Sequence, residues 1–415
     1  MTTFNPVWRL KINSVEYTDL ILANLTITSG RTDIYSQAVA GYVKLTVINL
    51  DQTNLDFQIN ANVSIELKDT SGTFVPIFGG SITDIDLAIA QIGSVGYSQS
   101  YSITALGALA RLPKSLFIDS LNQAGDGDQI YEILRGILLA QWQAVPAALT
   151  WATYDPTTQW QDAENTGLGE IDRPGDYTLI NRPAAPIDSY SLAANVALSG
   201  LGYLYENAQG QISYADSTHR TEYLSVNGYT DLSAAQARAA GLTIKTRSGD
   251  VRNAISIKYG AALAGDYTTS DLASIALYGS LGQVFSTYLK NATDAEDQGE
   301  FYLALRAYPQ PVFDSVTYDL TNPLIDDGDR DSLISVFMGL PVNITELPLN
   351  MNAGSFQGFV EGWTFQASYN QLSIQLFVSP LAFSLQAMRW NSVPVAEEWQ
   401  TINPTLDWQN ATIVA

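Results

Sequence analysis

The chain has 415 residues, and its 42 acidic against 20 basic side chains give a formal net charge of −22 with the one histidine neutral. Such an excess of negative charge repels duplex DNA and anionic membranes, and we find no local basic patch that would reverse this. Zero cysteines exclude a disulfide framework, thiol catalysis and thiolate metal sites. With no apolar run near the ~18 residues of a membrane span and no export signal, we expect a soluble protein made in the cytoplasm.

The first 112 residues read as a β-rich domain. From Val7 to about Leu112 apolar and polar residues alternate, as in Trp8–Ile12, Ile21–Ile27 and Val63–Leu67. This period of two predicts half-buried strands.

Two local signals shape this first domain. The Asp69–Gly72 turn predicts a hairpin. Past Gly79 and Gly80 the alternation changes phase between Ile82 and Ile85, which indicates a β-bulge. We therefore predict that Gly79 and Gly80 allow the bulge that curves this domain.

A mixed region follows over 113–245. Apolar spacing after Asp126 and Asp128 predicts an amphipathic helix with acidic capping, and a second helix over 189–198 should stop at Gly200. A hairpin with a turn at Asn207–Gly210 comes next. The stretch from 146 to 186 has no sustained period and predicts a long ordered loop.

A linking α/β segment covers 246–311. Thr293 and Glu296 have capping-box spacing, and the helix that they begin should end before Pro309.

Strand character returns over 312–385 and echoes the first domain. Val63-x-Ile65 and Phe78-x-x-Ser81-Ile82-Thr83 correspond to Val342-x-Ile344 and Phe359-x-x-Gly362-Trp363-Thr364. Closing strands around Tyr101 and Leu372 complete both sets. Either the chain carries two copies of one β unit, or two unrelated hairpin-rich sheets look this similar.

The last segment, 386–415, carries Trp390, Trp399 and Trp408 at a constant interval of nine. Neither a helix nor a strand places all three on one face, so an extended arm that docks each indole on a partner explains the spacing. A tail that folds back on its own domain is the alternative.

Signals for chemistry are weak. The single histidine, His219, is expected in a surface turn, and no phosphate loop or nucleophile elbow is present. The acidic segment Asp326–Asp331 offers oxygen ligands for calcium, although a solvated loop with helix-capping aspartates is more economical. We expect no catalytic residue, no metal and no cofactor.

The middle of the chain resembles the hub, or minor tail, proteins at the tip of tailed bacteriophages. The resemblance is carried by Gly202–Asp216, Val251–Tyr259, Asp271–Gly279 and Asp294–Glu296 in that order, and it is strongest between Leu192 and Pro311.

The resemblance implies a mainly β, α-containing (α+β) fold with two tube-like β-barrel domains, a mixed α/β middle region and an extended C-terminal arm. In such hubs a homotrimer forms a pseudo-sixfold ring that continues the tail tube. It implies a virion protein, assembled in the host cytoplasm, which conducts DNA and binds the tail tube or distal tail protein and central tip or fibre proteins. Many hubs continue into a lytic domain, and this chain does not, so enzymatic activity is not carried over.

Three other functions stay open. Trp151 and Trp160 could stack on sugars in a receptor- or glycan-binding tail protein. A cell-wall hydrolase would need a carboxylate pair, which 42 acidic residues cannot single out. A distal tail ring protein would be hexameric.

Overall fold

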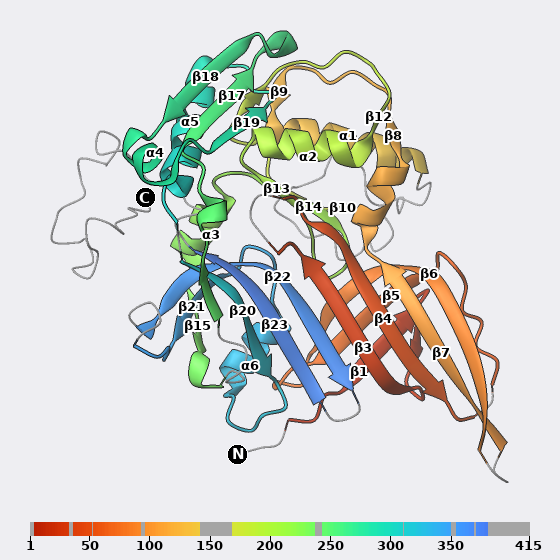
Figure 1. Cartoon of the computed structure of the whole chain (residues 1–415). Helices are drawn as coiled ribbons and strands as arrows, with labels where there is room; N and C mark the ends of the chain where they lie inside the picture. Colours follow the sequence, from red (N-terminus) through yellow and green to blue (C-terminus); the bar gives the residue numbers. More distant parts are fainter. Residues whose placement is uncertain are drawn as a thin grey trace.

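The computed structural model describes residues 4–32, 36–51, 53–92, 96–141, 168–236, 243–309, 311–349, 354–368 and 371–380. These residues form a large β-sheet with a smaller α/β region packed above it (Figure 1). None of the helices in the described residues is long and apolar enough to cross a membrane. The mainly β, α-containing fold predicted from the sequence is confirmed.

The large sheet contains thirteen described strands from both ends of the chain. Its strands are β1 (Trp8–Ile12), β2 (Val15–Tyr17), β3 (Ile21–Gly30), β4 (Val39–Asn49), β5 (Asn62–Lys68), β6 (Phe74–Ile92), β7 (Gly96–Leu106), β15 (Thr230–Ser233), β16 (Thr243–Thr246), β20 (Pro311–Asp319), β21 (Pro341–Thr345), β22 (Phe356–Ser368) and β23 (Gln371–Pro380). Its order is β16-β20-β23-β22-β3-β4-β7-β6-β5-β1-β2, with β21 on β22 and β15 on β21.

The strand order repeats within the sheet. The sequence β3-β4-β7-β6-β5 of the first half has the same connections as β16-β20-β23-β22-β21 of the second. In both, the three strands that carry the sequence echo form an antiparallel meander, β5-β6-β7 and β21-β22-β23. Shared topology favours two copies of one β unit over chance similarity.

The two halves are joined edge to edge. β22 pairs antiparallel with β3, from Gly362 opposite Gly30 to Ser368 opposite Asn24. Along the described strands the sheet runs from β16 to β2 without closing on itself, so two separate barrels are not seen in the single chain.

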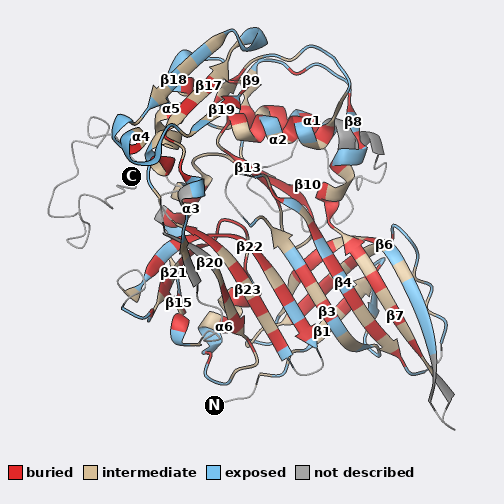
Figure 2. Cartoon of the chain, in the orientation of Figure 1, coloured by how far each residue is buried: buried red, intermediate tan, exposed pale blue. Residues whose placement is uncertain are grey.

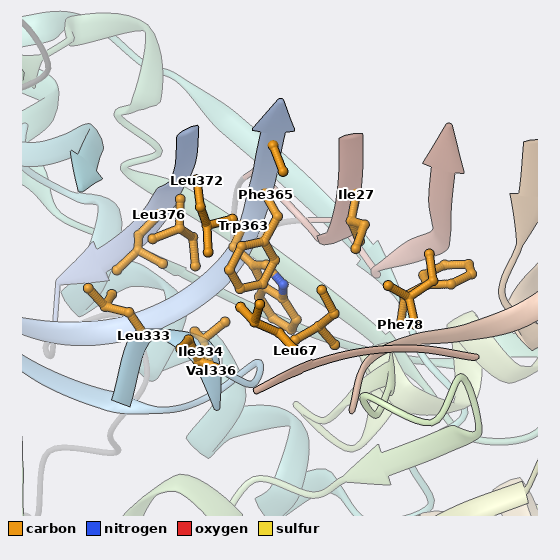
Figure 3. Close-up of a cluster of buried hydrophobic side chains, with 14 of the residues drawn as sticks. Ile27, Leu67, Phe78, Leu333, Ile334, Val336, Trp363, Phe365, Leu372 and Leu376 are labelled. Atoms are coloured by element: carbon orange, nitrogen blue, oxygen red, sulfur yellow. The ribbon is translucent and has the colours of Figure 1, made fainter. Parts of the chain in front are cut away.

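One hydrophobic core lies under both halves. Figure 3 shows Ile27 and Leu67 of the first half beside Trp363 and Phe365 of the second, with Leu333 of α6 closing one side. Because apolar surface buried in one continuous cluster cannot be exposed piecemeal, the halves should unfold together.

The region above the sheet has its own core. Its elements are η2 (Ala108–Lys114), β8 (Leu116–Phe117), β9 (Ala124–Gly125), α1 (Asp126–Gln141), β10 (Leu168–Ile171), β11 (Thr178–Leu179), β12 (Ile187–Asp188), α2 (Ser189–Ser199), β13 (Tyr203–Glu206), β14 (Ile212–Ala215), α3 (His219–Asn227), η5 (Ser248–Asp250), β17 (Ala254–Tyr259), η6 (Ala261–Leu263), β18 (Gly265–Ser270), α4 (Leu272–Tyr278), β19 (Gly282–Ser286) and α5 (Ala292–Arg306). The short helix η4 (Ala234–Gln236) follows β15 and packs on the core of the large sheet instead. Both predicted helices are confirmed: α1 begins at Asp126, and α2 ends just before Gly200. The predicted hairpin after α2 is confirmed as β13 and β14.

Three expectations differ in detail. The capping-box prediction for α5 was wrong, because Asn291 is the N-cap and Thr293 already lies in the first turn. Inside the second strand region the chain forms helix α6 (Asp327–Ile334), where the acidic segment breaks the alternation. β15 and β16 lie in the range predicted for the middle region, yet they pair into the large sheet.

Candidate functional site: the joined sheet and the region above it

The outer face of the joined sheet is polar and nearly uncharged. Core-facing residues alternate with accessible ones along β3, β4 and β23, and along β22 from Trp363 to Ser368 (Figure 2). On the six central strands β3, β4, β7, β20, β22 and β23 we call the following accessible polar residues the polar face: Thr26, Thr28, Lys44, Thr46, Ser102, Thr104, Thr317, Thr364, Gln366, Ser373 and Gln375. Tyr42, which is 39% exposed and lies opposite Thr28, stands on the same side.

Strand pairing makes the polar face continuous across the joint. One cross-strand row runs from Ser373 through Gln366, Thr26 and Lys44 to Thr104, and so passes from β23 to β7. Lys44 is the one basic residue in the described sequences of these six strands. A wall of this composition offers almost no cation to a phosphate backbone.

A buried ionic cluster holds the joint. Glu361 of β22 is 2% exposed in its side chain and accepts from Arg31 Nε at 2.7 Å and from Arg220 Nη1 at 2.8 Å. The Ser379 hydroxyl also donates to it, at 2.5 Å. Burial alone would raise the pKa of Glu361, but the two guanidinium groups lower it well below its usual range. The carboxylate is therefore charged and fully partnered.

The cluster connects three parts of the chain. Arg31 follows β3, Glu361 lies in β22, and Arg220 comes from α3 in the region above the sheet. The Tyr203 ring of β13 lies beneath both guanidinium groups, 4.5 Å from Arg220 and 5.3 Å from Arg31. Sequence reasoning missed this site, because its members stand 141 and 330 residues apart and none belongs to a local motif.

Two glycines bring the strands together at the same place. A Cβ on Gly30, whose φ is +83°, would stand 2.3 Å from the Glu361 carbonyl oxygen, and one on Gly362 would stand 2.5 Å from that of Arg31. Only glycine fits there, because both backbones approach too closely for a side chain.

A second buried carboxyl group, Asp126, lies at the start of α1. It is 0% exposed and accepts from the Tyr177 backbone N–H and the Tyr214 hydroxyl. Burial raises the pKa of Asp126 to about 7, although these hydrogen bonds partly oppose the shift. Asp126 was predicted to cap the helix, and its two carboxylate oxygens accept instead from Tyr177 and from Tyr214, which ties the start of α1 to β14.

A third carboxyl group, Glu206, links the upper region to the sheet. It ends β13 and accepts from the backbone N–H groups of Gly41 in β4 and Leu109 in η2, both at 2.6 Å. Burial raises the pKa of Glu206 to about 8 against the effect of these two donors.

The glycines predicted to form the bulge lie in regular pairing. Gly79 is opposite Ser64 and Gly80 is opposite Val63. A register shift does occur where the alternation changes phase, between Ile82 and Asp84. At Gly79 the structure shows a different constraint, since a Cβ there would lie 1.9 Å from the carbonyl oxygen of Gln209 in the β13–β14 turn.

The other candidate residues fall into two groups. Trp151, Trp160, Trp390, Trp399 and Trp408 lie outside the described residues, so their docking and sugar-stacking roles stay predictions. His219 was expected in a surface turn, and this was wrong: it begins α3 and its Nδ1 contacts Asp172 at 2.7 Å.

The aspartates of the Asp326–Asp331 segment already have partners. Asp326 caps α6, Asp329 accepts from the Ser233 backbone N–H, and Asp331 binds Thr70. Asp327 pairs with Arg330 at 2.5 Å. Among the described residues no group of three or more acidic or histidine side chains is placed to hold a metal ion.

Comparison with known proteins gives matches at the level of structure. No protein-family model matches the sequence, and no curated protein matches it either. The solved tail protein of Neisseria meningitidis MC58 shares 10% identity, covers 92% of this chain and 98% of its own, and superposes with a TM-score of 0.58. The 43 kDa tail protein of prophage MuSo2 from Shewanella oneidensis shares 13% identity over 91% of this chain and 99% of its own, with a TM-score of 0.51.

Both similarities extend over nearly the whole of each chain, so they concern the complete arrangement of sheet and upper region. At identities this low they establish the fold alone. The resemblance to phage tail proteins predicted from the sequence is therefore confirmed, and the chain has the fold of phage tail proteins.

Proposed function

We propose that this protein is the structural hub of a bacteriophage tail tip, in which three copies form a ring that continues the tail tube. One observation carries the proposal: the same five-strand order occurs twice and is joined through β22 and β3 into one sheet. A chain that presents two like units side by side can match a sixfold tube with three copies.

The polar face would line the channel in such a ring. Its threonine, serine and glutamine side chains present no array of cations, so DNA in transit would form few phosphate contacts and release few counterions. Three acidic residues, Asp84, Asp86 and Asp319, accompany the single Lys44 on this side of the sheet. The lining would repel the polyanion weakly and would not retain it.

The remaining parts of the proposal concern partners. The ring would stack on the tail tube or distal tail protein, and the segment with Trp390, Trp399 and Trp408 would bind central tip or fibre proteins. The protein would belong to the virion, after assembly in the host cytoplasm, and would act as an adaptor and conduit without catalysis.

The copy number tests the proposal. We expect the purified protein at about 0.1 mM, or the tip of the particle, to contain three copies, measured by native mass spectrometry and by symmetry in images of the tip. Six copies would make the protein a distal tail ring instead. A protein that stays monomeric both in solution and in the particle would contradict the hub.

A further inference from the structure

In the first half of the large sheet, part of strand β6 has an edge that pairs with no described strand. In the second half, the same edge of the corresponding strand β22 is paired. On the side facing β5, the pairing of β6 ends at Ser81, and Ile82 still bonds to Asn60 and Ala61. From Thr83 to Ile92 the described strand pairing of β6 is with β7 alone. Figure 1 shows this β6–β7 hairpin projecting at the lower right, beyond the rest of the sheet.

The corresponding edge in the second half is covered. β22 takes the place of β6 in the repeat, and its residues 362–368 pair with β3 on the side away from β23. The effect on burial is large: Ala367, opposite Leu372 of β23, is 4% exposed, whereas Leu87, opposite Tyr101 of β7, is 49% exposed. Ile89 is 63% exposed in the same open stretch. Long exposed apolar edges are normally protected in folded proteins, because they template pairing with other chains.

The repeat also identifies which strand is missing. β3 is the first strand of the first unit, pairs antiparallel with β4, and covers the edge of β22. The first strand of the second unit is β16, which pairs antiparallel with β20 and ends the sheet. Within one chain β16 does not pair with β6, and six strands of the sheet order lie between them.

The charges of the two edges are complementary. Exposed Asp84 and Asp86 stand on the open stretch of β6. The opposite edge is basic: Lys245 lies in β16, and Arg247 directly follows the end of this strand. The chain has only 20 basic residues, so two of them together at this edge stand out. Opposite charges that face each other across an interface favour one register and one partner.

We infer that β16 of one copy pairs antiparallel with the open edge of β6 in the next copy, as β3 pairs with β22 inside each chain. This deepens the proposed ring and rests on it, because it names the surface through which the copies join. The interaction is head to tail: the two edges lie on opposite sides of the sheet, with β6 at the right and the β20 end at the left in Figure 1. A head-to-tail contact closes into a ring when its rotation is a whole fraction of a full turn, which is one third of a turn for three copies.

A charge swap tests the interface. Asp84→Lys with Asp86→Lys, and separately Lys245→Glu with Arg247→Glu, should each raise the dissociation constant of the assembly at least about tenfold. Combining all four changes should restore most of the affinity, because the pairs are then opposite again. Val226→Lys with Leu349→Lys is a matched control, since both side chains are more than 80% exposed and lie away from either edge.

The absence of cysteine permits a second readout. Asp84→Cys with Lys245→Cys, treated with a short bis-maleimide, should give covalent dimers and trimers on a denaturing gel. Glu16→Cys with Lys245→Cys is the negative control. It places cysteines on β2 and β16, the two end strands of the sheet order, and it should not cross-link between copies.

The outcomes separate the two proposals. The proposed interface is wrong if the wild type forms trimers but the fourfold charge swap restores no affinity, or if the β2–β16 cysteine pair cross-links instead. In either case the proposal of a trimeric ring still holds. If the wild type forms no trimer, both are wrong. Thermal unfolding of each variant establishes that a loss of assembly is not a loss of folding.

Discussion

Glu361 holds the centre of the ionic cluster at the joint between the two halves. Its carboxylate is buried with two arginines, Arg31 and Arg220, that come from different parts of the chain. Removing one member of a buried ion cluster leaves uncompensated charge, which costs far more than the cluster contributes.

We therefore expect Glu361→Gln to lower the free energy of unfolding by about 3–5 kcal/mol, measured by urea denaturation. Glu132→Gln is the control: Glu132 pairs with Arg135 at the surface, both about half exposed, and its loss should cost less than about 0.5 kcal/mol. Equal effects of the two changes would show that the buried cluster does not stabilise the joint.

Asp126 should make stability depend on pH. Its folded pKa, about 7, lies above the unfolded value of about 4, so the folded state binds a proton that the unfolded state lacks between these values. Its contribution is complete below about pH 4 and is lost as the pH rises toward 7.

The matched variant is Asp126→Asn, which keeps an acceptor for the Tyr177 N–H and cannot titrate. The stability of the wild type minus that of Asp126→Asn should fall by roughly 2–4 kcal/mol between pH 4 and 8, measured by urea denaturation across that range. Glu206, with its pKa also raised, is present in both proteins and cancels. A difference that does not change with pH would refute a raised pKa at Asp126.

At the scale of elements, the β13–β14 hairpin is what seats the upper region on the sheet. Its turn approaches β6 so closely that Gly79 leaves no room for a Cβ, and Glu206 of the same hairpin accepts from β4 and η2. The approach is backbone to backbone, so a rotamer change cannot relieve a clash.

Gly79→Ala should cost at least about 2 kcal/mol of unfolding free energy, because strand and turn must separate. Gly249→Ala, where a Cβ meets nothing within 4 Å, should change it by less than about 0.5 kcal/mol. Chemical denaturation of both variants provides the comparison, and a neutral Gly79→Ala would mean that the turn moves freely over β6.

At the scale of the whole molecule, the net charge of −22 and the polar face both bear on how the protein interacts with DNA. Total charge by itself only aids solubility, because screening over about 10 Å confines electrostatic effects to the residues near DNA. The polar face identifies a surface on which cations are nearly absent.

Adding cations to that face should create DNA binding. A variant with Thr26→Lys, Thr104→Lys and Gln366→Lys should bind duplex DNA, with an affinity that falls steeply with salt, and should slow genome release from particles that carry it. Three lysines at Val226, Leu272 and Leu349, all strongly exposed elsewhere, serve as the control. If both triple variants bind DNA equally, the polar face has no special relation to the channel.

Much of the fold followed from local patterns. The alternation in Val7–Leu112, the apolar spacing after Asp126 and the stop at Gly200 are short-range signals, and strands and helices formed where they predicted. The echo of Val63-x-Ile65 in Val342-x-Ile344 also indicated a repeat that the strand order supports. Of the expectations for the acidic segment, helix capping is confirmed at Asp326, whereas the expected loop is helix α6, because its many charges hide the apolar Leu333 and Ile334 that the helix buries.

The sequence by itself determined the β-rich composition, the excess of acid and the order of the elements, since each of these depends on neighbours along the chain. Only the tertiary structure decided that Gly30 meets Gly362, that Glu361 pairs with both Arg31 and Arg220, and that the edge of β6 stays open. These features join residues hundreds of positions apart. Their energies depend on burial and close approach, which no local pattern encodes.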